Sequence, residues 1–146
     1  MTGLVEAICV SQDKGTAKKP VEQATFVVDY GVQGDAHAGD WHRQVSLLAA
    51  EEVAVWRERL PDLGPGDFAE NITTEGIDLL TLHLGGRLRL GESVELEITQ
   101  FGKKCHSDCE IFRQVGDCVM PREGIFARVI KPGRISVGDI IEVVDD

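Results

Sequence analysis

The chain has 146 residues, of which 42% are hydrophobic and 27% are charged, and its formal net charge is −10 at pH 7. This size and composition indicate one globular domain, spanning residues 1–146, with enough apolar surface for a single core. The acidic balance argues against nonspecific binding of nucleic acid and against binding to an anionic membrane surface, because both need a basic face.

The first predicted elements are short strands and a long irregular loop. A mostly apolar run at residues 4–10 predicts a strand, and the polar residues 11–20 after it predict an exposed loop. Residues 24–28 form a second run of β-branched and aromatic side chains, and residues 45–48 are again apolar. Between these two runs, residues 31–43 contain three glycines, two histidines and two aspartates without periodicity, and therefore predict a loop.

From Ala49 the hydrophobic pattern becomes helical. Val53, Trp56 and Leu60 recur at a spacing that places them on one face of a helix, while charged residues occupy the other faces. Pro61 ends the run, because proline cannot continue a helix. The sequence therefore predicts one clear helix in this part of the chain.

Beyond a Gly/Pro loop at residues 63–71, the apolar pattern has a period of two. Residues 87–90 and 94–99 alternate and flank a Gly91-Glu92 turn, which predicts two half-buried antiparallel strands. The remaining predicted elements are a short helix or turn at residues 105–116 and strands at residues 124–130 and 140–144. Six or seven strands joined by tight turns predict a mainly β protein, an antiparallel β-barrel with a few peripheral helices.

The sequence shows no export signal and no membrane span. No apolar run approaches the ~18 residues of a spanning helix, and the N-terminus lacks the basic start of a signal peptide. We therefore expect a cytoplasmic protein. In a reducing cytoplasm its four cysteines are thiols, metal ligands or catalytic groups, whereas two disulfides would suit a secreted chain.

Three of the four cysteines lie inside a locally basic stretch. Cys105, Cys109 and Cys118 fall close together, and residues 100–134 contain seven Lys or Arg against four Asp or Glu. Positive charge lowers the pKa of a thiol and makes thiolate available. The same charges suit an anionic ligand. This stretch is where we expect function to lie.

Cys105 is the strongest single candidate within that stretch. It directly adjoins Lys103, Lys104 and His106, which favours a partly exposed thiolate that acts as nucleophile, sulfur carrier or soft metal ligand. The alternative is a small apolar core residue, the usual place of a free cysteine. Two preceding lysines argue against that alternative, because lysine is rarely buried.

The cysteines can also be taken together as a zinc site. Cys105 and Cys109 are four residues apart and would share one helix face, while Cys118 and His106 would complete four ligands. The spacing lacks the paired CxxC knuckles of structural zinc modules. Zinc therefore stays an alternative to a single working thiol.

Two further segments carry polar groups with no regular pattern. The loop at residues 34–43, with its two histidines and two aspartates, can bind metal, orient a ligand or handle protons. Its other interpretation is a turn whose aspartates accept hydrogen bonds from nearby backbone amides. For residues 64–71 the alternatives are a set of backbone and Asn71 donors for a ligand, or a loop that leads into a strand.

In their order along the chain, these segments resemble the MOSC domain, the C-terminal domain of molybdenum cofactor sulfurases, which also occurs as small stand-alone bacterial proteins. The resemblance covers most of the chain, from about Gly31 to Val143. The matching pieces are Gly34-Asp35-Ala36-His37, Arg43-Gln44-Val45-Ser46-Leu47-Leu48, Gly66-Asp67-Phe68-Ala69-Glu70-Asn71-Ile72-Thr73, Leu84-Gly85, Leu90-Gly91-Glu92, Cys105, Gly124-Ile125-Phe126-Ala127-Arg128-Val129 and Gly138-Asp139.

The resemblance implies a β-barrel that binds a pterin-based molybdenum cofactor (molybdopterin), with Cys105 as the working thiol. Family members are thought to carry sulfur from a cysteine desulfurase to metal–sulfur sites, and some hold molybdenum through this cysteine and reduce N-hydroxylated compounds. It thus implies a cysteine desulfurase, or enzymes that make or use the cofactor, as partners. No pyridoxal phosphate site is evident, so the chain is not expected to produce sulfane sulfur itself.

These implications define the expected site. Cys105 would carry a persulfide or ligate molybdenum. The residues expected to bind the cofactor are His37, Arg43, Asn71, Lys103, Lys104, Arg122 and Arg128, with Cys109, Cys118 and His106 as auxiliary thiol or zinc ligands. Two alternatives stay open: a cofactor-dependent reductase of N-hydroxylated compounds with a partner electron donor, and a non-catalytic zinc or thiol module that binds a protein partner.

Overall fold

The structure is a computed structural model that describes residues 2–14, 16–102 and 124–145. The predicted helix or turn at residues 105–116 falls outside these residues. The predicted site residues that fall outside them are Lys103, Lys104, Cys105, His106, Cys109, Cys118 and Arg122.

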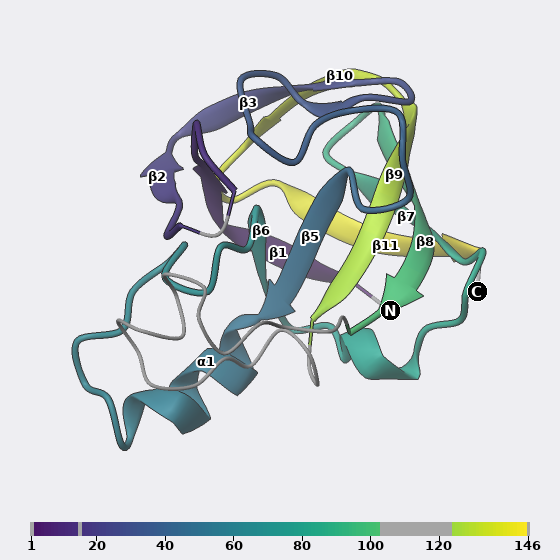
Figure 1. The fold of residues 1–146 in the computed structure, drawn as a ribbon. Coiled ribbons are helices and arrows are strands. Elements are labelled where there is room, and N and C mark those ends of the chain that lie inside the picture. Colours follow the sequence, from purple (N-terminus) through teal and green to yellow (C-terminus); the bar gives the residue numbers. More distant parts are fainter. Residues whose placement is uncertain (1, 15, 103–123, 146) are drawn as a thin grey trace.

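Strands are the main regular structure of the described chain (Figure 1). In chain order the elements are β1 (Thr2–Val10), β2 (Lys19–Val21), β3 (Gln23–Val27), β4 (Gly31–Val32), β5 (Val45–Ala49), α1 (Ala50–Arg57), β6 (Ile72–Glu75), the 3-10 helix η1 (Leu79–Thr81), β7 (Arg87–Leu90), β8 (Val94–Phe101), β9 (Ile125–Lys131), β10 (Gly133–Ser136) and β11 (Ile140–Asp145). No helix in the described ranges is long and apolar enough to cross a membrane.

Seven of the described strands close into a barrel. Their order is β11-β7-β8-β9-β5-β6-β1, and β1 pairs again with β11, with Leu4 opposite Ile140. β2 extends the sheet beyond β1, and β3, β4 and β10 form a separate three-stranded sheet that runs across the upper end of the barrel in Figure 1. The predicted mainly β barrel with peripheral helical structure is therefore confirmed.

One pairing in the ring departs from the expected antiparallel pattern. β5 and β6 are parallel, with Leu47 opposite Ile72. α1 and the loop that follows it carry the chain back to the end of the barrel where β5 began, which is the connection that parallel neighbours require. The expected tight turns between antiparallel neighbours therefore do not apply to the connection from β5 to β6.

β5 is buried along its whole length because it is covered on both faces. Val45 and Leu47 belong to the main core inside the barrel. Leu48 belongs to a second cluster outside the wall, with Val53 of α1 and Phe126 of β9. A strand covered on both faces favours apolar side chains at successive positions, as at Val45, Leu47 and Leu48. The buried Ser46 between them is hydrogen-bonded to Asn71.

The predicted helix is present but shorter than its apolar pattern. α1 ends at Arg57, and a turn follows in which the amide of Leu60 still donates to the carbonyl of Trp56 at 2.9 Å. Trp56 and Leu60 both pack on the second cluster. The spacing of these side chains therefore identified the buried face correctly, although the last of them lies beyond the helix.

Candidate functional site

The loop between β4 and β5, residues 33–44, lies beside the start of β5 on the outer wall of the barrel. Arg43 ends this loop, and its Cζ lies 5.8 Å from the ring centroid of Phe126. Two residues before Phe126, Gly124 accepts a 2.7 Å hydrogen bond from the amide of Gly102. The segment that carries Cys105 thus leaves and rejoins the barrel close to this loop.

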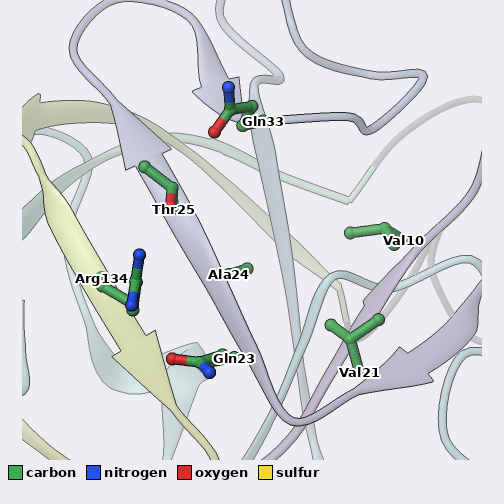
Figure 2. Close-up of a pocket in the computed structure, with 7 residues that line it drawn as sticks. All are labelled: Val10, Val21, Gln23, Ala24, Thr25, Gln33 and Arg134. Atoms are coloured by element: carbon green, nitrogen blue, oxygen red, sulfur yellow. The ribbon is translucent and has the colours of Figure 1, made fainter.

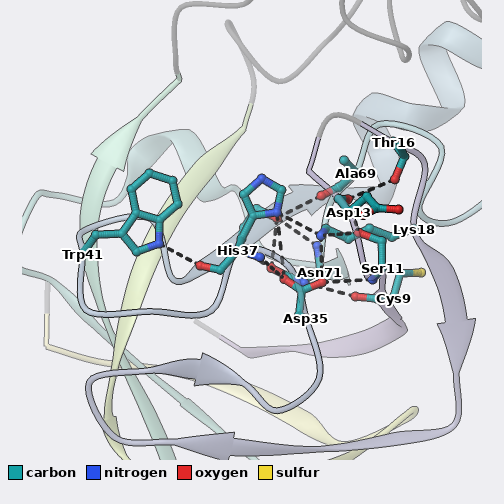
Figure 3. A network of polar contacts seen from close by, with 11 residues as sticks. Cys9, Ser11, Asp13, Thr16, Lys18, Asp35, His37, Trp41, Ala69 and Asn71 are labelled. Carbon is teal, nitrogen blue, oxygen red and sulfur yellow. Dashed lines mark hydrogen bonds and ion pairs between the residues drawn. The ribbon is translucent and has the colours of Figure 1, made fainter.

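A buried ion pair forms the centre of the site (Figure 3). Lys18 Nζ lies 2.7 Å from Asp35 Oδ1, and both side chains are 0% exposed. Lys18 Nζ also donates to Ser11 Oγ at 3.1 Å and lies 3.0 Å from His37 Nδ1. The amide of Lys18 donates to the carbonyl of Gly66 at 2.7 Å, which places the lysine between two loops.

Asp35 organises the turn that carries His37. Its Oδ1 accepts from the amide of Ser11 at 3.1 Å, and its Oδ2 accepts from the amide of His37 at 3.1 Å. Burial alone would raise the pKa of Asp35, but the hydrogen bond and charge of Lys18, with the Ser11 amide, hold that pKa below its ordinary value. The interpretation of Asp35 as an acceptor for backbone amides is confirmed, and Asp35 remains a carboxylate.

Aromatic and cationic side chains extend the site from His37 toward Phe126. The rings of His37 and Trp41 are parallel, with centroids 6.4 Å apart, and Trp41 Nε1 donates to the carbonyl of His37 at 2.7 Å. Arg43 Cζ and Lys14 Nζ lie over the Trp41 ring, at 4.5 and 4.8 Å from its centroid. Arg43 Nε is buried and has no hydrogen-bond partner among the described residues. This leaves one oriented donor without an acceptor.

Asn71 is completely buried and its side chain is engaged by protein groups. Its Oδ1 accepts from the amide and the hydroxyl of Ser46, at 3.0 and 3.2 Å, and its Nδ2 donates to the carbonyl of Cys9 at 3.1 Å. Asn71 therefore joins β1, β5 and the start of β6. A contact between Asn71 and a cofactor stays a prediction, and in this structure its amide positions the loops around the site.

Glu70 is a second buried organiser, and the sequence did not single it out. It is 0% exposed, and its carboxyl accepts from the amides of Gly66 and Phe68, at 3.1 and 3.2 Å, and from the hydroxyl of Thr73 at 3.3 Å. Burial raises the pKa of Glu70, although these hydrogen bonds act against the rise. A glutamate in a Gly/Pro loop directly before an apolar strand was the available signal.

Cys9 is the one cysteine among the described residues, and it does not resemble a working thiol. It is 0% exposed. Burial, followed by the charge of Glu70, raises its pKa to about 12. Cys9 therefore remains a neutral thiol at physiological pH and behaves as a small apolar side chain.

The described basic residues of the stretch at 100–134 do not meet in one place. Arg128 pairs with Glu97 at 2.8 Å and with Asp29 at 3.5 Å, and neither partner belongs to the Lys18 network. Arg134 lines a separate pocket of about 370 Å³ together with side chains of β1, β2, β3 and Gln33 (Figure 2). Cofactor binding by Arg128 stays a prediction, and the charge on Arg128 is partly neutralised.

Lys18 and Ser11 are two further site residues that sequence reasoning missed. Both lie in the tract at residues 11–20, which was predicted to be an exposed loop, yet Lys18 is 3% exposed. Nothing in the local pattern distinguishes Lys18 from Lys14 and Lys19, which are exposed. Lys18 is buried because it contacts Asp35 and Gly66. These residues are distant in the sequence, so the local pattern around Lys18 could not predict its burial.

The close packing of the Gly66 turn against Lys18 leads to a prediction. Gly66 and Gly34 have φ values of 86° and 84°, so alanine at either position carries the same left-handed cost, about 1–2 kcal/mol. At Gly66 a methyl group would also overlap the carbonyl of Lys18, whereas nothing lies within 4 Å at Gly34. In denaturant unfolding, Gly66→Ala should be less stable than Gly34→Ala by about 1–3 kcal/mol. Equal losses would contradict the packing described here.

The protein is thus a closed seven-stranded β-barrel with a site beside its wall. The site contains the buried Lys18–Asp35 ion pair and the stacked side chains of His37, Trp41 and Arg43. The model of the MOSC domain matches residues 33–142, and the chain belongs to this family. A similar protein is YiiM of Escherichia coli (strain K12), 24% identical over 158 residues, which cover 98% of this chain and 69% of that protein.

Solved structures show the same fold. The YUAD protein from Bacillus subtilis superposes with a TM-score of 0.80 at 21% identity, covering 97% of this chain and 94% of that one. YiiM from Geobacillus stearothermophilus superposes with a TM-score of 0.74 at 21% identity, covering 98% and 75%. At these identities the likeness establishes the barrel, and the function has to be argued from the site.

Proposed function

We propose that this protein binds the molybdenum cofactor or carries sulfur for it, with Cys105 as the molybdenum ligand or the persulfide carrier. Membership of the MOSC family supports the cofactor class. The observation that carries the proposal is the buried Nε of Arg43, which has no hydrogen-bond partner among the described residues and lies over Trp41, near the point where the segment of Cys105 joins the barrel. A guanidinium donor without an acceptor fits an anionic ligand group such as a pterin phosphate.

The described residues fit the polar part of such a cofactor. Arg43 would bind the phosphate, and His37 would contact the pterin. Lys18 and Asp35 hold His37 in place, and Asn71 positions the neighbouring loops. When bound, the cofactor would supply a metal centre for redox or sulfur chemistry, with a soft thiolate as ligand. We assign Lys103, Lys104, Arg122 and Arg128 as further phosphate candidates from the sequence.

The proposed partners follow from the same chemistry. A persulfide on Cys105 needs a donor of sulfane sulfur, and no pyridoxal phosphate site is evident in this chain. A cysteine desulfurase is therefore the proposed donor, and enzymes that build or use the cofactor are the proposed acceptors. Attack of the Cys109 or Cys118 thiolate on the Cys105 sulfur would break the persulfide S–S bond, release sulfide and leave a disulfide between the two cysteines.

The test is to purify the protein from a host that makes the molybdenum cofactor. We expect either molybdenum with pterin, or an added mass of about 32 Da for one sulfur atom on Cys105. Cys105→Ser should remove the bound species and leave the melting temperature nearly unchanged. Cys9→Ala is the matched control, because Cys9 is a buried neutral thiol and its loss should not affect loading.

Two results would overturn the proposal. Retention of the cofactor or of the added sulfur by Cys105→Ser would remove Cys105 from the mechanism. Stoichiometric zinc on protein with unmodified thiols would favour the zinc module instead. The described residues contain no cluster of three or more His, Cys, Asp or Glu side chains suited to a metal ion, so such zinc would involve the cysteine segment.

A further inference from the structure

The three donors of the Lys18 ammonium meet three different acceptors. An ammonium group has three N–H donors and no acceptor. Lys18 Nζ lies 3.1 Å from Ser11 Oγ, 2.7 Å from Asp35 Oδ1 and 3.0 Å from His37 Nδ1. Figure 3 shows these three groups converging on the lysine from the loops on either side. The lysine can therefore make all three hydrogen bonds at once.

Each acceptor is arranged so that it receives a proton rather than offers one. The hydroxyl of Ser11 donates to the carbonyl of Asp13 at 3.0 Å, which leaves its lone pairs for Lys18. Asp35 is a buried carboxylate in contact with Lys18, and this contact keeps the lysine in its charged, donor-only form. His37 Nδ1 lies 3.0 Å from the Lys18 donor and 3.9 Å from Asp35 Oδ2. Of these two groups only the lysine is within hydrogen-bond distance, so Nδ1 has to present its lone pair.

This arrangement determines where the ring proton of His37 lies. A neutral imidazole carries one proton, and the hydrogen bond at one nitrogen decides which nitrogen holds it. With Nδ1 accepting from Lys18, the proton is on Nε2. The ring is also held in orientation, because Trp41 lies parallel to it and bonds to its carbonyl, and Asp35 bonds to its amide.

We propose that Lys18 is a positioning residue that holds His37 in the Nε2–H tautomer, so that His37 acts as a hydrogen-bond donor to a carbonyl or phosphate oxygen of the bound ligand. A histidine held in this way is neither a general base nor a metal ligand through Nε2, since both roles need a lone pair on that atom. The tautomer is a property of the protein alone. The ligand part of the inference rests on the proposed cofactor binding.

The tautomer is tested by nitrogen-15 NMR of the histidine side chains in the cofactor-free protein near neutral pH. The His37 signals are those lost in His37→Gln. We expect wild-type His37 to be almost entirely Nε2–H, whereas the exposed His42 and His83 show mixtures of the two tautomers. In Lys18→Met, His37 should shift to a mixture, while Lys19→Met, at the exposed neighbouring lysine, should leave it unchanged.

Two results would overturn the positioning role. One is a wild-type His37 that carries its proton on Nδ1 or shows the same mixture as His42. The other is a folded Lys18→Met variant with unchanged Nε2–H. If Lys18→Met does not fold, Lys18→Met/Asp35→Asn removes both buried charges and gives the same readout. If neither variant folds, the wild-type spectrum decides.

The donor role is tested with two replacements of His37. Glutamine retains an acceptor for Lys18 and a donor for the ligand, so His37→Gln should keep most of the molybdenum and pterin per chain. Glutamate offers acceptors only, so His37→Glu should lose roughly tenfold or more, equivalent to about one strong hydrogen bond. Equal losses in both variants would overturn the donor role.

Cofactor binding and the donor role of His37 can fail separately. If the wild-type protein binds no cofactor, the proposed function fails while the tautomer measurement still stands. If the wild-type protein binds cofactor and both His37 variants lose it equally, the proposed function stands and the donor role fails.

Discussion

Replacing Lys18 with methionine is expected to lower the free energy of unfolding by about 3–5 kcal/mol, because the buried carboxylate of Asp35 loses its counter-ion. Both side chains are 0% exposed, so water cannot take over the role of the ammonium. Urea unfolding at neutral pH measures the loss. Lys19→Met, at an exposed neighbour, should change the stability by less than about 0.5 kcal/mol.

The double variant Lys18→Met/Asp35→Asn separates two contributions to the free energy of unfolding: that of the intact ion pair, and the cost of leaving one buried charge unpaired. Removing both charges should recover a large part of the loss, since a buried pair contributes much less than an unpaired buried charge costs. If the double variant is no more stable than Lys18→Met, the loss arises from packing of the lysine stem instead.

The same pair predicts how stability depends on pH. The pKa of Asp35 is lowered below 3.8 in the folded protein, so its contribution is fully present above that value and is lost as pH falls through the folded pKa. Wild-type protein should therefore lose more stability below about pH 4 than the double variant does. The raised pKa of Glu70 gives the opposite slope, but it is common to both proteins and cancels in the difference.

Replacing Asn71 with leucine is expected to cost about 3–5 kcal/mol, because it leaves the Ser46 amide and the Cys9 carbonyl short of partners in a buried site, at about 1–3 kcal/mol for each group left unsatisfied. These are contacts that the Asn71 amide makes in the structure. The Ser46 hydroxyl keeps the Ala69 carbonyl as an acceptor. Thermal and urea unfolding measure the effect. Gln12→Leu, at an exposed amide, is the matched control and should be nearly neutral.

The size of this loss also decides between two roles for Asn71. A loss below about 1 kcal/mol together with loss of cofactor binding would mean that Asn71 contacts the ligand, as the sequence suggested. A large loss of stability supports the positioning role that its buried contacts indicate. Asn71→Asp also tests the positioning role. It keeps an acceptor for Ser46 but places a carboxylate oxygen against the Cys9 carbonyl, so a positioning role predicts a loss of stability in this variant too.

The barrel could be predicted from the sequence where a strand shows clear alternation or a distinct apolar run. The alternation at residues 87–90 and 94–99 led to β7 and β8, whose hairpin places Leu88 opposite Leu96. β2, β4, β6 and β10 were not predicted, since each has only two to four residues and lacks the alternation that identified the equally short β7. The parallel step from β5 to β6 was also missed, because it depends on the path of the intervening chain.

The sequence by itself determined the fold class and the helix, because each is encoded by residues close together in the chain, and it offered the loop around His37 as one candidate site among several. Only the tertiary structure decided which groups surround that loop. Asp35 is 17 residues from Lys18, and Asn71 is 62 residues from Cys9. Burial turns an ordinary surface lysine into the ion-pair partner at the centre of the site, and burial results from long-range packing rather than from local pattern.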